Sequence, residues 1–242
     1  MFLKACLNGA RLQDQHPALP ISPAQLAAGA ASAQALGVSA IHVHVKDADG
    51  ADTFGSAELA DVLKAVHASA PGLPIGVTTG AWALPDPADR AAAVRSWSTL
   101  PAFASVNWHE DGADQVAEAL LDRGVHVEAG LWNIEAISSW SKSRFRDRCL
   151  RVLIELPDGL DADETASEAR SLLGAMRVAA GRRIPTLVHG EGSSCWPAVR
   201  YARRQGLATR IGLEDTLELP DGAIAPDNDS LIKAALQILH PG

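Results

Sequence analysis

The chain has 242 residues, of which 47% are hydrophobic, and its formal net charge is −8 at pH 7. This length and apolar content suit one sizeable core, while the acidity and the absence of a basic stretch argue against nucleic acid as a partner. No run of the sequence reaches the roughly 20 apolar residues of a membrane helix, so we expect no membrane partner.

Eight short apolar runs, rich in β-branched residues, are predicted to be buried strands. In chain order they are residues 2–8, 40–46, 75–80, 103–108, 125–131, 150–156, 186–190 and 209–215. Between them, stretches rich in alanine and leucine have the spacing of helices. We expect these helices at residues 22–37, 56–72, 86–97, 112–124, 162–181, 194–206 and 228–239. The first has Ser22 as its N-cap, Pro23 at the first helical position and Gly37 at its end.

The alternation of strand and helix favours parallel strands joined by crossover helices. Eight such units in 242 residues fit a (β/α)₈ TIM barrel. Because no linker divides the sequence, we predict a single barrel domain over residues 1–242. An open sheet of the flavodoxin type with extra units is the alternative. No GxGxxG motif follows the first predicted strand, which speaks against a dinucleotide-binding fold.

The run AIHVHVK, residues 40–46, carries two histidines two positions apart. On a strand, residues i and i+2 face the same side, so His42 and His44 are predicted to point one way. Two imidazoles at this spacing can converge on one metal ion, and a catalytic zinc then needs one or two more ligands and an open position. The alternative is a pair of hydrogen-bonded core histidines.

Polar residues concentrate where the predicted strands end. Active sites of barrels form at the C-terminal ends of the strands, and polar groups within apolar strands are costly unless they are paired. Packing alone therefore does not explain this concentration. The candidates are Asn8, Arg11, His42, His44, Thr78, Thr79, Ser105, Asn107, Glu128, His189, Glu191, Arg210, Glu214 and Asp215.

The last predicted strand, residues 209–215, offers the third metal ligand. Arg210 and Glu214 alternate with Ile211 and Leu213, so Glu214 is predicted to point into the barrel and to join the histidine pair. Two histidines and one glutamate with an open position form a known catalytic zinc arrangement. Asp215 could then act as the general base, with Arg210 orienting it or binding an anion. A helix cap or a solvated turn is the alternative for Glu214 and Asp215.

The sequence HGEGSS, residues 189–194, precedes a predicted helix and has two interpretations. Ser193 or Ser194 could simply cap that helix. Alternatively, the N-terminus of the helix could bind an anion, as it does in many barrels. The sequence does not favour either.

Several segments taken together resemble the beta-keto acid cleavage enzyme family. They are HVHVKDADG (42–50), RIGLED (210–215), PDNDSLI (226–232), NGA (8–10), HPALPISP (16–23) and TTGA (78–81). The segments follow the family's order through nearly the whole chain, and the histidine motif combined with GLED is the specific part.

The resemblance implies a (β/α)₈ barrel, a bound Zn²⁺ and assembly as a homo-oligomer. It also implies that a β-keto acid and acetyl-CoA are converted to acetoacetate and a new CoA ester. The steps would be proton abstraction at the α-carbon, addition to the thioester, intramolecular CoA transfer and retro-Claisen cleavage. By matching motifs, the metal ligands would be His42, His44 and Glu214, the base and its support Asp215 and Arg210, and the substrate-binding residues Thr78, Thr79, Ser105 and Asn107.

One departure from the family pattern concerns Arg11, which stands where well-known members have a glutamate that pairs with a substrate amine. If Arg11 faces the pocket, the distal group of the substrate is expected to be a carboxylate or a polar group.

A zinc-dependent aldolase, lyase or hydrolase that acts on a keto acid without CoA is the alternative function. A barrel that only binds a ligand is a third. Dependence of substrate loss on CoA separates the first two.

The three cysteines, Cys6, Cys149 and Cys195, lie far apart and form no CxxC pair. A small and odd number of cysteines is typical of a protein in a reducing compartment rather than of one held together by disulfides. The N-terminal sequence MFLKACLNGA does not have the long apolar run of a signal peptide. We therefore expect a cytoplasmic protein.

Overall fold

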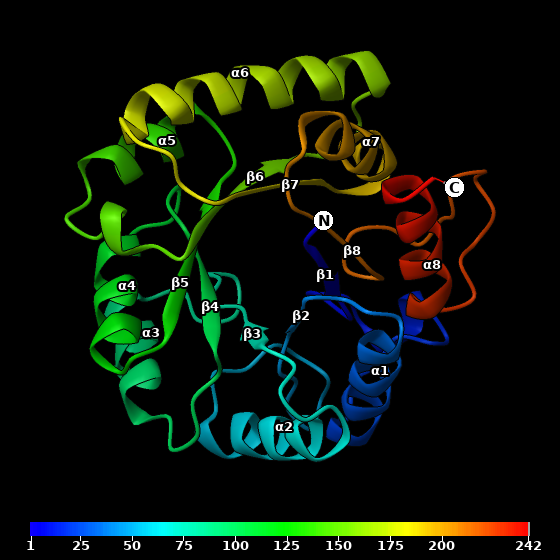
Figure 1. Cartoon of the computed structure of the whole chain (residues 1–242). Coiled ribbons are helices and arrows are strands. Elements are labelled where there is room, and N and C mark those ends of the chain that lie inside the picture. Colours follow the sequence, from blue (N-terminus) through cyan, green and yellow to red (C-terminus); the bar gives the residue numbers. More distant parts are fainter. Residues whose placement is uncertain (242) are drawn as a thin grey trace.

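The computed structural model describes residues 1–241, in which eight parallel strands are surrounded by eight α-helices (Figure 1). The strand order is β7-β6-β5-β4-β3-β2-β1-β8, so the first and last strands of the chain are neighbours. The predicted (β/α)₈ barrel is thereby confirmed. The strands are β1 (Leu3–Cys6), β2 (Ala40–Val43), β3 (Ile75–Val77), β4 (Phe103–Asn107), β5 (His126–Leu131), β6 (Arg151–Leu156), β7 (Thr186–Gly190) and β8 (Thr209–Ile211).

The barrel closes only loosely between β7 and β8. Leu187 and Ala208 form an isolated parallel bridge, and the Val188 amide donates to the Ala208 carbonyl at 3.0 Å. The Thr209 hydroxyl adds one bond to the Val188 carbonyl at 2.8 Å. Other neighbouring strands form regular ladders, such as the five residue pairs between β6 and β7. The seam between β7 and β8 is thus the least hydrogen-bonded part of the barrel wall.

All seven predicted helices are present, and the structure adds an eighth, α5, that the sequence interpretation missed. Asn133 caps α5 (Ile134–Lys142) by accepting a hydrogen bond from the Ala136 amide at 2.8 Å. Trp140 lies on the face of this helix that is buried against the rest of the protein. The predicted start of α1 is confirmed, since Ser22 accepts from the Gln25 amide. The helices are α1 (Pro23–Ala35), α2 (Ser56–Ser69), α3 (Pro87–Ser96), α4 (Ala113–Asp122), α5 (Ile134–Lys142), α6 (Ala162–Ala180), α7 (Cys195–Gln205) and α8 (Asn228–Leu239). Within residues 1–241, none of them combines the length and apolarity required to cross a bilayer.

The apolar core lies between the strands and the ring of helices. In β2, Ile41 and Val43 belong to this core, while His42 between them lines the interior of the barrel. This alternation follows from the two-residue period of a strand. Residues that face the barrel interior are therefore free to be polar, provided that they find partners there.

A buried ion cluster fills the N-terminal end of the barrel. The Lys4 ammonium lies 2.5 Å from the Glu128 carboxylate, and both side chains are fully buried. Arg151 approaches the other Glu128 oxygen at 3.1 Å. The Phe103 ring packs beside this cluster, where Gly76 makes room for it, since a Cβ on Gly76 would lie 1.9 Å from the ring. The sequence interpretation grouped Glu128 with the residues at the C-terminal strand ends, and this is wrong: it is a structural anchor near the opposite end.

Candidate metal centre and active site

A cavity of about 500 Å³ opens at the C-terminal ends of the strands. Most of the residues that were predicted for the site line it, although they come from five different strands or the loops after them. These residues are Arg11, His42, His44, Thr78, Ser105, Asn107, Arg210 and Glu214. Of the residues predicted to act in catalysis, metal binding or substrate binding, Thr79 and Asp215 are not among those that line the cavity, and neither are the further candidates Asn8, Glu128 and His189.

His42, His44 and Glu214 form a cluster in which one ligand atom from each residue lies within 4.8 Å of the others. The two imidazole centroids are 5.3 Å apart, and His44 Nε2 is 3.9 Å from a Glu214 oxygen. Two nitrogens and one carboxylate oxygen are a donor set that Zn²⁺ prefers, and the cavity beside them leaves an open position. The three residues therefore fit a divalent metal.

Unpaired buried atoms support this fit. His42 Nδ1 and Glu214 Oε2 are buried and have no hydrogen-bond partner among residues 1–241. Such groups are costly unless a ligand or an ion completes their bonding. Burial first, and then the positive charges of Lys4 and Arg210 and the neighbouring His44, hold the pKa of His42 well below its ordinary value. His42 is thus neutral at pH 7, as an imidazole ligand must be.

Asn8 fixes the histidine side of the cluster. β2 ends at Val43, so His44 lies just beyond the regular strand. The Asn8 side chain supplies the hydrogen bonds that a strand neighbour would give, because its Nδ2 donates to the His44 carbonyl and its Oδ1 accepts from the His44 amide, both at 2.8 Å. Both histidines consequently face the cavity, as the strand period predicts.

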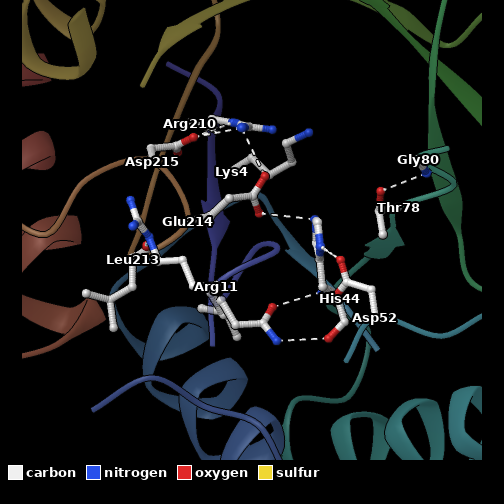
Figure 2. Close-up of polar contacts among 12 residues, drawn as sticks. Lys4, Arg11, His44, Asp52, Thr78, Gly80, Arg210, Leu213, Glu214 and Asp215 are labelled. Atoms are coloured by element: carbon white, nitrogen blue, oxygen red, sulfur yellow. Dashed lines mark hydrogen bonds and ion pairs between the residues drawn. The ribbon is translucent and has the colours of Figure 1, made fainter. Parts of the chain in front are cut away.

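Glu214 reaches the cluster through a turn and not, as the sequence interpretation had it, as a residue of the strand. β8 ends at Ile211, and the turn is closed by a 2.9 Å bond from the Asp215 amide to the Gly212 carbonyl. Gly9, at φ +62°, allows the close approach, since a Cβ there would lie 2.5 Å from Glu214 Cγ. Arg210 holds one Glu214 oxygen at 3.0 Å, which leaves the other directed at His44 (Figure 2).

Asp52, which the sequence interpretation missed, orients His44. Its carboxylate accepts from His44 Nδ1 at 2.8 Å and from the Trp82 indole at 2.7 Å, and it lies 2.6 Å from the Lys46 ammonium. Burial alone would raise the pKa of Asp52, but these partners outweigh it and lower the pKa to about 2. The bond occupies Nδ1 and leaves Nε2 of His44 for a metal, which is the usual role of a carboxylate behind a histidine ligand.

We expect Asp52→Asn to weaken metal binding by roughly 10–100-fold, because losing this carboxylate frees the His44 ring and reduces its basicity. The measurement is a competition titration of the metal-free protein with zinc and a chromophoric chelator. Asp49→Asn, an exposed carboxylate of the same loop, is the matched control. Equal affinities for the two variants would remove Asp52 from the support of the metal site.

Arg210 and Asp215 form a buried pair beside the cavity. Arg210 Nε and Nη2 donate to the same Asp215 oxygen at 3.0 and 2.7 Å. Asp215 is fully buried, and its second oxygen has no hydrogen-bond partner in the described part of the chain. Burial would raise the pKa of Asp215, but the Arg210 charge and His189 keep it below its ordinary value. The carboxylate is therefore ionised but screened from the cavity.

The predicted substrate-binding residues divide into two groups. Thr78 lines the cavity, and its oxygen accepts from the Gly80 amide at 3.2 Å, so its own proton remains available (Figure 2). Thr79 faces elsewhere and donates to the Ser105 carbonyl at 2.7 Å. Ser105 and Asn107 both line the cavity, and the Asn107 amide donates to Glu110 at 2.9 Å.

Arg11 lines the cavity and is partly buried. Its Nε donates to the Leu213 carbonyl at 2.6 Å, which ties it to the turn that carries Glu214 (Figure 2). Lys46 donates to the Arg11 carbonyl at 3.1 Å and so couples the same loop to Asp52. The guanidinium is thus placed at the cavity wall as a cationic group.

The segment at residues 189–194 does not provide the predicted serine cap for α7. Ser194 is the N-cap of α7 but makes no side-chain cap, and its hydroxyl bonds the Pro157 carbonyl instead. An anion does occupy the amides at this point, but it is the chain's own: Asp158 accepts from the Ser193 amide at 2.8 Å and from the Gly159 amide at 2.7 Å. This internal carboxylate holds Ser193 just before α7, and the anion site at the helix N-terminus stays a prediction.

The predicted candidate Glu191 lines the cavity, and so do residues to which the sequence interpretation gave no role, among them Trp82, Trp132, Glu155 and Asp158. Glu155 had a signal, because a glutamate within the apolar run 150–156 is costly to bury without a partner. The tryptophans follow strand ends, where active-site residues gather. Asp158 lies in a loop whose path a single sequence does not give.

Comparisons with known proteins agree with this architecture. A curated relative, the 3-keto-5-aminohexanoate cleavage enzyme of Fusobacterium nucleatum, is 22% identical over 255 residues, which is 98% of this chain and 90% of that protein. The solved complex of ObcA with oxaloacetate has a TM-score of 0.70 at 17% identity and matches 91% of this chain. The ternary complex of ObcA with a C4-CoA adduct and oxalate has a TM-score of 0.72 at 16% identity.

This chain spans 63% of the ObcA chain in both complexes, and at these identities the likeness concerns the fold. The decisive comparison is the family model described as beta-keto acid cleavage enzyme, which matches residues 1–241. That match covers the histidine pair on β2 and the Glu214 turn after β8 together. The chain belongs to the beta-keto acid cleavage enzyme family.

Proposed function

We propose that this protein is a zinc-dependent acyltransferase that converts a β-keto acid and acetyl-CoA into acetoacetate and a new acyl-CoA. The observation that carries the proposal is the cluster of His42, His44 and Glu214 at the cavity, in a chain of this family. The ObcA complexes add support, because ObcA binds oxaloacetate and a C4-CoA adduct on a similar barrel.

The donor set bears on the choice of metal. Two imidazoles and one carboxylate suit Zn²⁺, whereas Mg²⁺ and Ca²⁺ favour sites built from oxygen alone. A metal held by His42, His44 and Glu214 would supply Lewis-acid stabilisation of the negative charge that develops on the substrate oxygens. The other roles fall to side chains of the chain.

The chemistry of the substrate requires a base and donors for its oxygens. A carboxylate must take a proton from the carbon between the two carbonyl groups, and the sequence predicts Asp215 for this role. Thr78 has a free hydroxyl proton at the cavity, and Ser105 also faces it, so both suit the carboxylate or the keto oxygen of the substrate. Arg210 contacts Glu214 at 3.0 Å and Asp215 at 2.7 Å, and its charge helps to keep the pKa of Asp215 below its ordinary value.

Arg11 bears on the substrate's distal group. A guanidinium at the cavity wall favours a β-keto acid with a second carboxylate and disfavours one with an amine.

We expect Arg11→Glu to reverse this preference and to change the ratio of kcat/KM for the two kinds of substrate by at least about 10-fold. The measurement is kcat/KM for a carboxylate-bearing and an amine-bearing β-keto acid, with Arg95→Glu, an exposed position on α3, as the control. If the wild type and Arg11→Glu have the same ratio of kcat/KM for the two substrates, Arg11 does not contact the distal group.

The experiment that tests the function is a screen of β-keto acids with the zinc-loaded protein and acetyl-CoA. New CoA thioesters and acetoacetate are read by mass spectrometry. Thioester formation that needs both substrates is the expected result. Loss of the keto acid without CoA would instead favour an aldolase or a related lyase on the same metal site.

A further inference from the structure

A second cavity, of about 780 Å³, lies at the opposite end of the barrel from the metal cluster. Arg151 and Thr186 are the first residues of β6 and β7, and Ala208 directly precedes β8, so the cavity opens at the N-terminal ends of these strands. Small-molecule sites have volumes of about 300–1,000 Å³, so the space is sufficient for one. None of the residues that line it lines the cavity of the metal cluster.

Four arginines and no acidic residue line this second cavity, namely Arg151, Arg177, Arg182 and Arg183. The whole chain has a net charge of −8, so this concentration of positive charge is local. The C-terminus of α6 accounts for Arg177, which lies in the last turn of that helix, but the other three lie outside the helices. A concave site lined by charges of one sign attracts a ligand of the opposite sign, and four cations suit an anion with more than one negative charge.

The four guanidinium groups differ in how they are held. The Arg151 guanidinium lies 3.1 Å from Glu128 and 4.2 Å from the centre of the Phe2 ring, and Arg182 donates to Asp147 at 3.0 Å. Arg177 and Arg183 are exposed, and neither forms an ion pair or a side-chain hydrogen bond within residues 1–241. The cavity therefore combines two anchored cations with two whose donors are left for a ligand.

The rest of the cavity wall is largely apolar. It includes Phe2, Leu150, Met176, Ile184, Pro185 and Leu207. A guanidinium matches two phosphate oxygens at once, and four of them exceed what a single carboxylate would neutralise. An apolar wall with an aromatic ring suits a flat heterocycle, because such rings stack on one another. Phosphate groups joined to a flat base are the chemistry of a nucleotide.

The position of the cavity links ligand binding to the stability of the barrel. Its wall includes Pro185 and Thr186 on the side of β7, and Leu207 and Ala208 on the side of β8. Ala208 also forms the isolated bridge to Leu187 that joins the two strands. A ligand in the cavity contacts both sides of this junction, so it binds the folded barrel and not the unfolded chain.

We propose that this cavity is a second ligand site, which binds a nucleotide through a diphosphate group and a flat base. The guanidinium groups of Arg177 and Arg183 hold the phosphates, and the apolar wall around Phe2 holds the base. The same chemistry occurs in a free nucleoside diphosphate and in the ADP part of coenzyme A. The site is separate from the metal cluster and does not depend on the function proposed above.

The test is calorimetric titration of the zinc-loaded protein with ADP, with coenzyme A and with inorganic pyrophosphate. We expect saturable ADP binding that weakens at least about 10-fold in the double variant Arg177→Gln/Arg183→Gln, because two charged hydrogen-bond donors are lost. The matched control is Arg203→Gln/Arg204→Gln, which removes two exposed arginines of α7 outside the cavity and should bind ADP like the wild type. ADP should also raise the unfolding midpoint of the wild type and of the control, but not that of the first variant.

The three probes separate the sources of the ligand. Coenzyme A that binds here loses affinity in Arg177→Gln/Arg183→Gln, whereas coenzyme A that binds only at the metal cavity does not, and ADP is then the ligand of this site. Three results would overturn the proposal: no saturable binding of ADP or coenzyme A, equal affinities in the two double variants, or pyrophosphate binding as tightly as ADP. The thioester screen decides the proposed function separately, because neither double variant changes a residue of the metal cavity.

Discussion

His42→Ala is expected to lose its bound metal and, with it, the cleavage activity. The change removes one of three ligands that lie within 4.8 Å of one another, and the remaining His44 and Glu214 cannot hold a divalent cation in a closed geometry. Since removing only a supporting group costs 10–100-fold, losing a ligand should lower metal affinity by more than about 100-fold. Metal analysis after dialysis against a weak chelator is the measurement.

The control for this experiment is His67→Ala, which removes an exposed histidine on α2 and should leave the metal content unchanged. A His42→Ala protein that keeps stoichiometric metal would sink the assignment of the ligand set, whatever its activity. Thermal unfolding adds an independent readout, because a ligand bound only to the folded state raises the midpoint of the wild type and not that of the variant.

Glu128→Gln is expected to destabilise the barrel by about 3–5 kcal/mol, because it leaves the fully buried Lys4 ammonium without a counter-ion. For a chain of this size, that loss corresponds to a drop of roughly 6–20 °C in the unfolding midpoint. Thermal or denaturant unfolding followed by circular dichroism measures it.

Two further variants make the interpretation specific. Glu118→Gln removes one partner of the exposed ion pair with Arg144 and should cost less than about 1 kcal/mol. Lys4→Met combined with Glu128→Leu removes both buried charges and should recover much of the loss, since apolar replacements of a buried pair are often neutral. If the single Glu128→Gln variant unfolds like the wild type, the cluster does not stabilise the fold.

Much of the site follows from short sequence spacings. The period of a strand is enough to place His42 and His44 on one side, and the alternation of elements is enough for a barrel. Glu214 lies beside the two histidines, as predicted, but it lies in a turn after β8 and not within the strand. Its position depends on Gly9, a residue more than 200 positions earlier.

Two kinds of contact could not be predicted from the sequence: those that depend on the path of a loop, and those that depend on how deep a residue lies in the barrel. Asp52 follows His44 by eight residues, and only the fold of the intervening loop returns it to the ring. Glu128 and Glu155 both interrupt apolar strands, yet one lies at the N-terminal end with Lys4 and the other at the cavity. The two-residue period of a strand predicts on which side of the sheet a side chain lies, but it does not predict how far along the barrel axis that side chain lies.

The loose closure between β7 and β8 has a consequence for the metal. Two ligands belong to β2 and its end, and the third follows β8, so a bound cation would fasten the last strand to the second across β1. Because β8 has few hydrogen bonds to β7, its local opening is detachment from β1, and that detachment would require release of the cation. At a free metal concentration 100 times the dissociation constant, the added cost of opening is about 2.7 kcal/mol. Backbone amides of Thr209–Ile211 should accordingly exchange with deuterium about 100-fold more slowly in the metal-loaded protein than in the stripped one.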